Sequence, residues 1–89
     1  MEIEFDAEKD RSNMAKHGIS LARAADIEIL SVLEDERIDY GERRFRAWGV
    51  IDGVAHCLVF TVRNDAVRAI SLRRAHRKEI ERYGQKTQS

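Results

Sequence analysis

The chain has 89 residues, a mass of 10.3 kDa and a formal net charge of zero, and 36% of its residues are charged. This length predicts a single domain, residues 1–89, with a small hydrophobic core. The only cysteine, Cys57, excludes an internal disulfide bond, and no export signal or long apolar stretch is visible. We therefore expect a cytoplasmic protein that does not enter a membrane.

The zero net charge hides a strong asymmetry along the chain. Up to Glu42 the sequence holds five Lys/Arg against twelve Asp/Glu, and after it eleven against four. A basic half of this kind is typical of proteins that bind an anionic partner, most often nucleic acid. The alternative interpretation is that these charges only keep the surface soluble.

The N-terminal part predicts a short strand and two helices. Residues 2–5 can form the strand. Asp6 as an N-cap and Gly18 after the last turn bound a helix that ends at about His17. Ser20 can cap a second helix, whose apolar residues form one buried stripe. The two helices would then form a helical hairpin with a very short connection.

The middle of the chain predicts three strands. The first runs from Ile29 to about Ile38, although its start could also finish the preceding helix. Arg44–Ile51 and Val54–Arg63 both alternate, and Asp52-Gly53 between them is the typical sequence of a two-residue hairpin turn. Pairing Ile51 with Val54 puts one set of residues on a core face: Phe45, Ala47, Gly49, Ile51, Val54, Leu58, Phe60 and Val62. The opposite face would carry Arg44, Arg46, Trp48, Cys57, Val59, Thr61 and Arg63, with Glu42 across from Arg63 if the pairing reaches that far.

The C-terminal part predicts a returning strand, Val67–Arg73, then a helix from Ala75 to Tyr83, and a frayed tail at Gln85–Ser89. Together these elements predict an α+β domain. A helical hairpin would pack on one face of an antiparallel sheet of about four strands. The opposite, basic face would bind RNA, and the last helix would flank it.

The basic face offers groups that RNA cleavage requires. Attack by a 2′-hydroxyl needs a base, cationic stabilisation of the transition state and an acid for the leaving oxygen, but no metal. Arg44, Arg46, Arg63 and Arg68 could clamp phosphates while Trp48 stacks a base. The alternative is that these arginines keep the sheet soluble and that Trp48 covers a small satellite core.

The histidines need separate consideration because their pKa lies near neutrality. His17 could act as a general acid or base, although stabilisation of the helix end explains it almost as well. His56 falls on the core face, where a hydrogen-bonded interior imidazole is expected. The three histidines and one cysteine have no recognised ligand spacing, so no metal or other cofactor is expected.

The order of the elements and a set of short motifs resemble the BrnT toxins, from Phe5 to about Tyr83. The motifs are Asp6-Ala7-Glu8-Lys9, Lys16-His17-Gly18-Ile19-Ser20, Gly41-Glu42-Arg43-Arg44-Phe45, Gly49, Thr61-Val62-Arg63 and Arg68-Ala69-Ile70-Ser71-Leu72-Arg73-Arg74-Ala75. The resemblance implies a compact relative of the RelE ribonucleases that cleaves RNA and inhibits translation. It also implies a ribbon-helix-helix antitoxin, similar to BrnA, that covers the active face and represses the shared operon. Operator DNA would then be contacted only through the antitoxin.

The resemblance also implies the site residues. Arg44, Arg63 and Arg73 would hold the scissile phosphate, and Glu42 or His17 would handle the proton. Ser71 would orient a phosphate or a guanidinium. The residues expected to bind substrate are Lys16, Arg46, Trp48, Arg68, Ser71 and Arg74. Phe5, Leu72 and His76 depart from the family pattern, and Leu72, in place of a small residue, could crowd the site.

The register raises one difficulty for this site. With Asn64-Asp65 as a two-residue turn, Ser71 and Arg73 fall on the core face, opposite Arg63. We expect one residue of bulge to reverse this, because burying Arg73 without a partner would be costly.

Two other functions remain open at this point. The chain could be an inactive homologue whose task is to bind an antitoxin or repressor, since no strong acid/base pair is evident. Direct DNA binding ranks third, because no helix-turn-helix with a basic recognition helix is visible.

Overall fold

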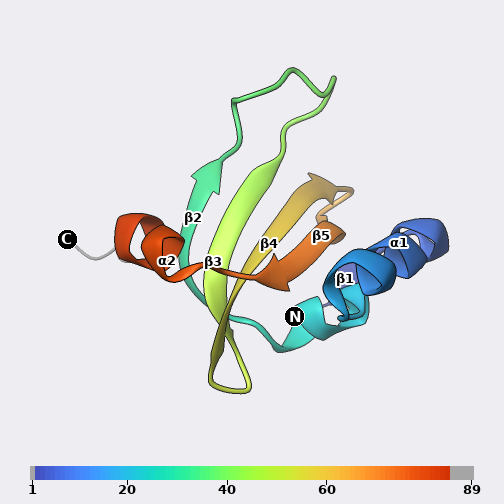
Figure 1. The fold of residues 1–89 in the computed structure, drawn as a ribbon. Coiled ribbons are helices and arrows are strands. Elements are labelled where there is room, and N and C mark those ends of the chain that lie inside the picture. The colour runs from blue at the N-terminus through green and yellow to red at the C-terminus, as the bar shows by residue number, and fades with distance from the viewer. Residues whose placement is uncertain (1, 85–89) are drawn as a thin grey trace.

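The computed structural model describes residues 2–84, which form an α+β fold around one five-stranded sheet (Figure 1). The strand order is β1-β5-β4-β3-β2; β1 runs parallel to β5, and all other neighbours are antiparallel. The elements in chain order are β1 (Ile3–Glu4), α1 (Ala7–His17), the 3₁₀-helix η1 (Leu21–Asp26), β2 (Glu28–Glu34), β3 (Phe45–Ile51), β4 (Val54–Arg63), β5 (Ala66–Arg74) and α2 (Arg77–Tyr83).

Helix α1 begins and ends as predicted. The Asp6 carboxylate accepts a hydrogen bond from the Glu8 N–H at 3.0 Å. Gly18 adopts a left-handed conformation, φ 72°, and its N–H donates to the Met14 carbonyl at 2.9 Å. Without a Cβ, glycine adopts this conformation with little strain, so it closes the helix.

The second predicted helix is present only as the six-residue 3₁₀-helix η1, so the predicted helical hairpin is wrong in this respect. Ser20 is its N-cap, as expected, and its hydroxyl accepts from the Ala22 N–H at 3.1 Å. The Asp10 carboxylate accepts from the Leu21 N–H at 2.7 Å, which anchors the start of η1 to α1. A 3₁₀-helix suits a short connection of this kind.

The β3–β4 hairpin has the predicted register, with Ile51 opposite Val54 and Trp48 opposite Cys57. The sheet differs from the prediction at both edges. The short strand predicted at residues 2–5 is present as β1, but it joins the sheet as a fifth strand, parallel to its neighbour, and makes the sheet mixed. β2 ends at Glu34 rather than at Ile38, because the chain then turns into a loop stabilised by its own side chains.

A β-bulge in β5 confirms the predicted reversal of the register. Ser71 lies opposite Val59, but Ala69 lies opposite Phe60, so Ile70 is the extra residue. Beyond the bulge Arg73 pairs with Cys57. Ser71 and Arg73 therefore lie on the same face of the sheet as Arg63.

The core lies on the face of the sheet that η1 and α1 cover, which we call the inner face. Val62, predicted for this face, is 53% exposed, because the end of β4 extends past the part that these helices cover. The buried cluster consists of Leu21, Ala24, Ile27, Ala47, Ile51, Leu58, Ala69 and Leu72. Helix α2 lies across the opposite, outer face (Figure 1). It begins at Arg77 rather than Ala75, because the Ala75 N–H still donates to the Ala55 carbonyl at 3.0 Å. Within residues 2–84 no helix is long and apolar enough to cross a membrane.

Asn13 joins α1 to the edge of β5 directly after the bulge. Its amide nitrogen donates to the Leu72 carbonyl at 2.7 Å and to the Ile19 carbonyl at 2.9 Å, and its oxygen accepts from the Leu72 N–H at 3.0 Å. The side chain thus occupies the place of a paired strand. Only 5% of the residue is exposed, so water cannot replace these bonds.

We predict that Asn13→Ala lowers the free energy of unfolding by about 2 to 3 kcal/mol, because the buried N–H and carbonyl of Leu72 and the partly buried carbonyl of Ile19 lose their partner. Urea unfolding measures this change, and Ser12→Ala, at the exposed neighbouring position, is the control. A loss of less than about 0.5 kcal/mol would contradict the assignment.

Candidate functional site

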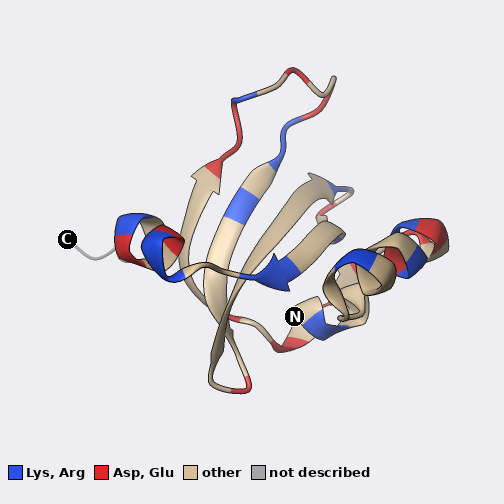
Figure 2. Cartoon of the chain, in the orientation of Figure 1, with Lys and Arg blue, Asp and Glu red and all other residues tan. Residues whose placement is uncertain are grey.

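The outer face of the sheet is a basic surface. Strands β3, β4 and β5 contain arginines but no aspartate or glutamate, and Figure 2 shows the acidic residues concentrated in the helices and loops. On the outer face, residues that are paired across neighbouring strands form rows that run across the sheet. Starting from the β4–β5 turn there are four such rows, and the last two extend into β2. The rows are Arg63 with Ala66; Thr61 with Arg68; Ser71, Val59, Arg46 and Leu33; and Arg73, Cys57, Trp48 and Ser31.

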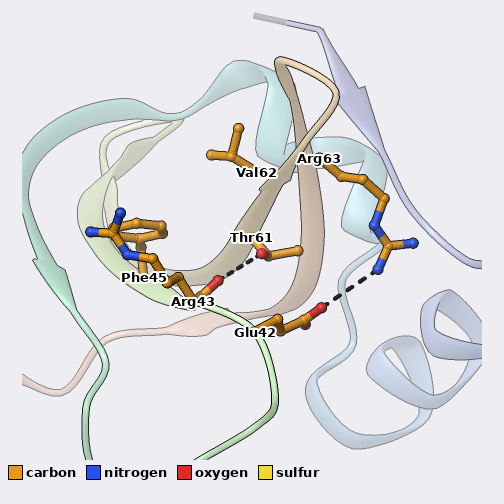
Figure 3. A pocket seen from close by; sticks show the side chains of 6 residues that line it. All are labelled: Glu42, Arg43, Phe45, Thr61, Val62 and Arg63. Carbon is orange, nitrogen blue, oxygen red and sulfur yellow. Dashed lines mark hydrogen bonds and ion pairs between the residues drawn. The ribbon is translucent and has the colours of Figure 1, made fainter.

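Glu42 holds two arginines at the end of the β3–β4 hairpin. It accepts from Arg44 Nε at 3.2 Å and from Arg63 Nη2 at 3.5 Å. The paired positions of β3 and β4 end at Phe45 and Phe60, so Glu42 meets Arg63 through the side chains and not as a paired strand position. The Arg44 guanidinium also lies 4.0 Å from the centre of the Tyr40 ring. Figure 3 shows Glu42, Thr61 and Arg63 among the side chains that line a cavity of about 470 Å³. We call Glu42, Arg44 and Arg63 the Glu42 cluster.

The loop before β3 fixes the Glu42 cluster in place. The buried Asp35 carboxylate accepts two hydrogen bonds from Arg37, at 2.7 and 2.9 Å, and one from the Tyr40 hydroxyl at 3.2 Å. Bonding to Arg37 holds the pKa of Asp35 well below its usual range. The Asp35 N–H also donates to the Arg44 carbonyl at 2.7 Å. The base of the loop is therefore closed, and Glu42 is carried on its returning arm.

A second ion pair holds α2 on the outer face. Arg73 donates two hydrogen bonds to Glu79, at 2.7 and 2.8 Å. Glu79 also accepts from the His76 N–H at 2.9 Å, which caps α2. Chiefly through the bond to Arg73, the pKa of Glu79 falls to about 2. Arg73 thus has a carboxylate partner in this state.

Trp48 is a core residue of the outer face rather than an exposed stacking platform. Its ring is 0% exposed and stacks on Tyr83 of α2 with ring centres 4.5 Å apart. The alternative interpretation, a satellite core, therefore describes Trp48 in this state. Arg46 lies beside both rings, 5.2 and 5.3 Å from their centres. Burial raises the pKa of the neighbouring Cys57 to about 11, so its thiol is neutral at pH 7.

The structure does not bring all the predicted site residues together. Arg63 and Arg73 share the outer face but lie far apart along it. Arg73 pairs with Cys57, which is six residues from Arg63 along β4, a distance of roughly 20 Å along the strand. Lys16 and His17 lie beyond the edge of β5, where they share a cavity of about 240 Å³ with Ser71. Leu72, which could have crowded the site, is instead fully buried on the inner face and leaves the outer face open.

Arg74 lies on the other side of the sheet from the Glu42 cluster. It pairs with His56, which the register places on the inner face, and both line a cavity of about 300 Å³ with His17. His56 is 6% exposed and its Nδ1 lies 2.7 Å from the Val54 carbonyl, in agreement with the expected interior imidazole. Among residues 2–84 no group of three or more His, Cys, Asp or Glu side chains could hold a metal ion.

Four residues that organise the site were not found from the sequence: Asn13, Asp35, Glu79 and Tyr83. Glu79 had a detectable signal, because an acidic residue three positions after a helix N-cap is typical of a capping box. Asn13, Asp35 and Tyr83 act through contacts that are distant in sequence or within an irregular loop, so no periodic pattern marks them.

Comparison with known families identifies the chain. The model of the ribonuclease toxin BrnT of type II toxin-antitoxin systems matches residues 5–79. The chain belongs to the BrnT family. It is thus a ribonuclease toxin of a type II system, and this membership implies a protein antitoxin and an RNA target. Comparisons with curated proteins and with solved structures gave no match, so the likeness to RelE ribonucleases stays a prediction.

The Arg73–Glu79 ion pair predicts acid sensitivity. Because the pKa of Glu79 is about 2 in the folded state and ordinarily 4.5, its stabilisation is present above pH 4.5 and is lost as the pH falls toward 2. The loss should reach at most about 3 kcal/mol. Thermal unfolding across this range measures it.

In Glu79→Gln the melting temperature should be lower at pH 7 and should fall less steeply with acid. Glu81→Gln, on the exposed side of α2, is the matched control. An unchanged acid dependence in Glu79→Gln would contradict the assignment.

Proposed function

We propose that this BrnT chain cleaves single-stranded RNA on its outer face by attack of the 2′-hydroxyl, without a metal ion, and thereby inhibits translation. The observation that carries the proposal is the unpaired charge of this face. Arg46 and Arg68 have no carboxylate partner among residues 2–84, and the buried Nε of Arg46 lacks a hydrogen-bond acceptor. A phosphate of RNA would supply the missing charge partner of these two arginines.

The Glu42 cluster supports the catalytic part of the proposal. The Glu42 carboxylate can take the proton of the 2′-hydroxyl, and Arg44 and Arg63 can neutralise charge that develops on the phosphate. Exposed ion pairs of this kind contribute only about 0 to 1 kcal/mol, so an RNA phosphate can replace the 3.5 Å contact between Arg63 and Glu42.

Arg73 has a different role in this proposal. Its guanidinium is bound to Glu79, and its row lies away from the Glu42 cluster. We assign it to holding α2 on the outer face, through its two hydrogen bonds to Glu79. His17 and Lys16, beyond the β5 edge, would contact the strand rather than the scissile bond.

The partner proposed for the outer face is a ribbon-helix-helix antitoxin that covers the arginines and links the toxin to operator DNA. Membership of a type II family supports a protein partner, and the arginines without carboxylates would suit acidic side chains of that partner. The second candidate function is an inactive homologue that only binds the antitoxin. The pairing of Arg44, Arg63 and Arg73 with carboxylates favours this alternative.

Cleavage of RNA by the purified chain in the presence of EDTA tests the catalytic proposal. We expect Arg63→Ala and Glu42→Gln to lower the cleavage rate about a hundredfold or more and to relieve growth arrest. Arg73→Ala should also relieve growth arrest. Arg77→Ala, an arginine on α2 that is 93% exposed, is the matched control and should cleave at the wild-type rate.

A wild-type chain that leaves RNA and translation untouched would contradict the enzymatic proposal. Equal RNA cleavage rates in Arg63→Ala and Arg77→Ala would instead show that the Glu42 cluster does not catalyse the reaction.

Mixing the chain with the protein encoded beside it tests the partner. We expect a stable complex that no longer cleaves RNA, and weaker binding after Arg46→Ala, because the charged centre of the interface is lost. Size-exclusion chromatography and a cleavage assay measure both effects. A complex that still cleaves RNA would contradict an antitoxin bound over the outer face.

A further inference from the structure

The cavity on the inner side of the sheet is separate from the outer-face site. It has a volume of about 300 Å³, which lies at the lower end of the range for small-molecule sites. The end of α1, η1, the β3–β4 turn, the start of β4 and the end of β5 line it. Its lining consists of His17, Gly18, Ile19, Arg23, Ile51, Asp52, Val54, His56 and Arg74.

His56 presents an unused hydrogen-bonding atom to this cavity. The residue is 6% exposed, and its Nδ1 lies 2.7 Å from the Val54 carbonyl. A carbonyl oxygen only accepts, so Nδ1 carries the proton and Nε2 of the neutral ring is an acceptor. No group among residues 2–84 bonds to Nε2. A ligand that donates a hydrogen bond would therefore satisfy it.

Arg74 lies next to His56 in the wall of this cavity. Arg74 is the cross-strand partner of His56, and its guanidinium forms no ion pair with any residue in the described chain. Arg23, by contrast, donates to Asp52 at 2.7 Å and to Asp26 at 3.0 Å, so its charge is already compensated. One side of the cavity thus attracts an anion, while Asp52 and His56 offer acceptors.

His17 connects this cavity with the outer face. It also lines the 240 Å³ cavity that contains Ser71, Lys9 and Lys16. Neither lysine forms an ion pair within residues 2–84. Positive side chains thus continue from Ser71 on the outer face, around the edge of β5, to Arg74.

We propose that the inner cavity is a nucleotide subsite with a preference for guanine. Arg74 and His17 would hold the phosphate, and the base would lie against Ile19 and Val54. Guanine presents adjacent N–H and amino donors, to which Asp52 and His56 would each offer an acceptor; uracil has a single N–H and no amino group. The inference rests on the ribonuclease function, because an RNA strand leaving the outer face would reach this site.

Nucleotide binding, measured independently of cleavage, tests the subsite. The imidazole C–H signals of His17 and His56 are followed by NMR while GMP, UMP or inorganic phosphate is added to about 10 mM. A 2′-O-methyl trinucleotide with a terminal guanosine is added in a parallel experiment. It shows whether the natural ligand of the subsite is part of an RNA strand or a free nucleotide. GMP should shift both histidines and bind about tenfold more tightly than UMP or phosphate.

Two substitutions test which side chains of the cavity bind GMP. Arg74→Gln should weaken GMP binding about tenfold, while Arg77→Gln, the exposed control, leaves it unchanged. Asp52→Asn should reduce the preference for GMP over UMP.

Equal binding of GMP, UMP and phosphate would overturn the nucleotide subsite, as would unshifted histidines. Continued RNA cleavage by the same sample would then show that only the subsite has failed. Tighter binding of the trinucleotide than of GMP would identify an RNA strand as the ligand of the subsite, and tighter binding of GMP would identify a free nucleotide.

Discussion

The outer face depends on one extra residue in β5. Ile70 interrupts the pairing with β4, so Ser71 and Arg73 point to the outer face while Leu72 points into the core. A strand without this bulge would bury Arg73 and expose Leu72, and both changes are unfavourable. Asn13 bonds to the N–H and carbonyl of Leu72 directly after the bulge. The helix that covers the core thus also stabilises the register that forms the outer face.

The same face combines paired and unpaired cations. Arg44, Arg63 and Arg73 each have a carboxylate partner, whereas Arg46 and Arg68 have none in the described part of the chain. The charge asymmetry of the sequence therefore overstates how positive the surface is. The paired arginines are held in place without substrate, and the phosphates of RNA can compete for them. This arrangement favours a surface that is organised before RNA binds.

Much of the fold could be predicted because it depends on local signals. The Asp52-Gly53 turn and the alternation around it define the hairpin register, and Asp6, Gly18 and Ser20 mark helix ends. The bulge was predicted by a different argument, the cost of burying Arg73. These residues each act through neighbours in sequence or through one face of a strand.

Other features could not be predicted because distant contacts determine them. Two residues of β1 carry no signal for a parallel pairing with β5. Trp48 falls on the outward-facing side of the alternation in β3 and so was expected to face RNA, but Tyr83, far along the chain, covers it. The short η1 has the capping and apolar pattern of an α-helix. For the site, family motifs supplied most residues, yet they did not reveal that Arg63, Arg73 and His17 lie in three separate places.

The central claim is that RNA lies along the outer face, next to the Glu42 cluster. An amide chemical-shift map with a 2′-O-methyl RNA, which lacks the attacking hydroxyl, tests it most directly. The account predicts the largest shifts at Arg44, Thr61, Arg63 and Arg68, with Arg46 also affected. Shifts confined to the exposed side of α2 or to the β3–β4 turn, with none at Arg63, would contradict it.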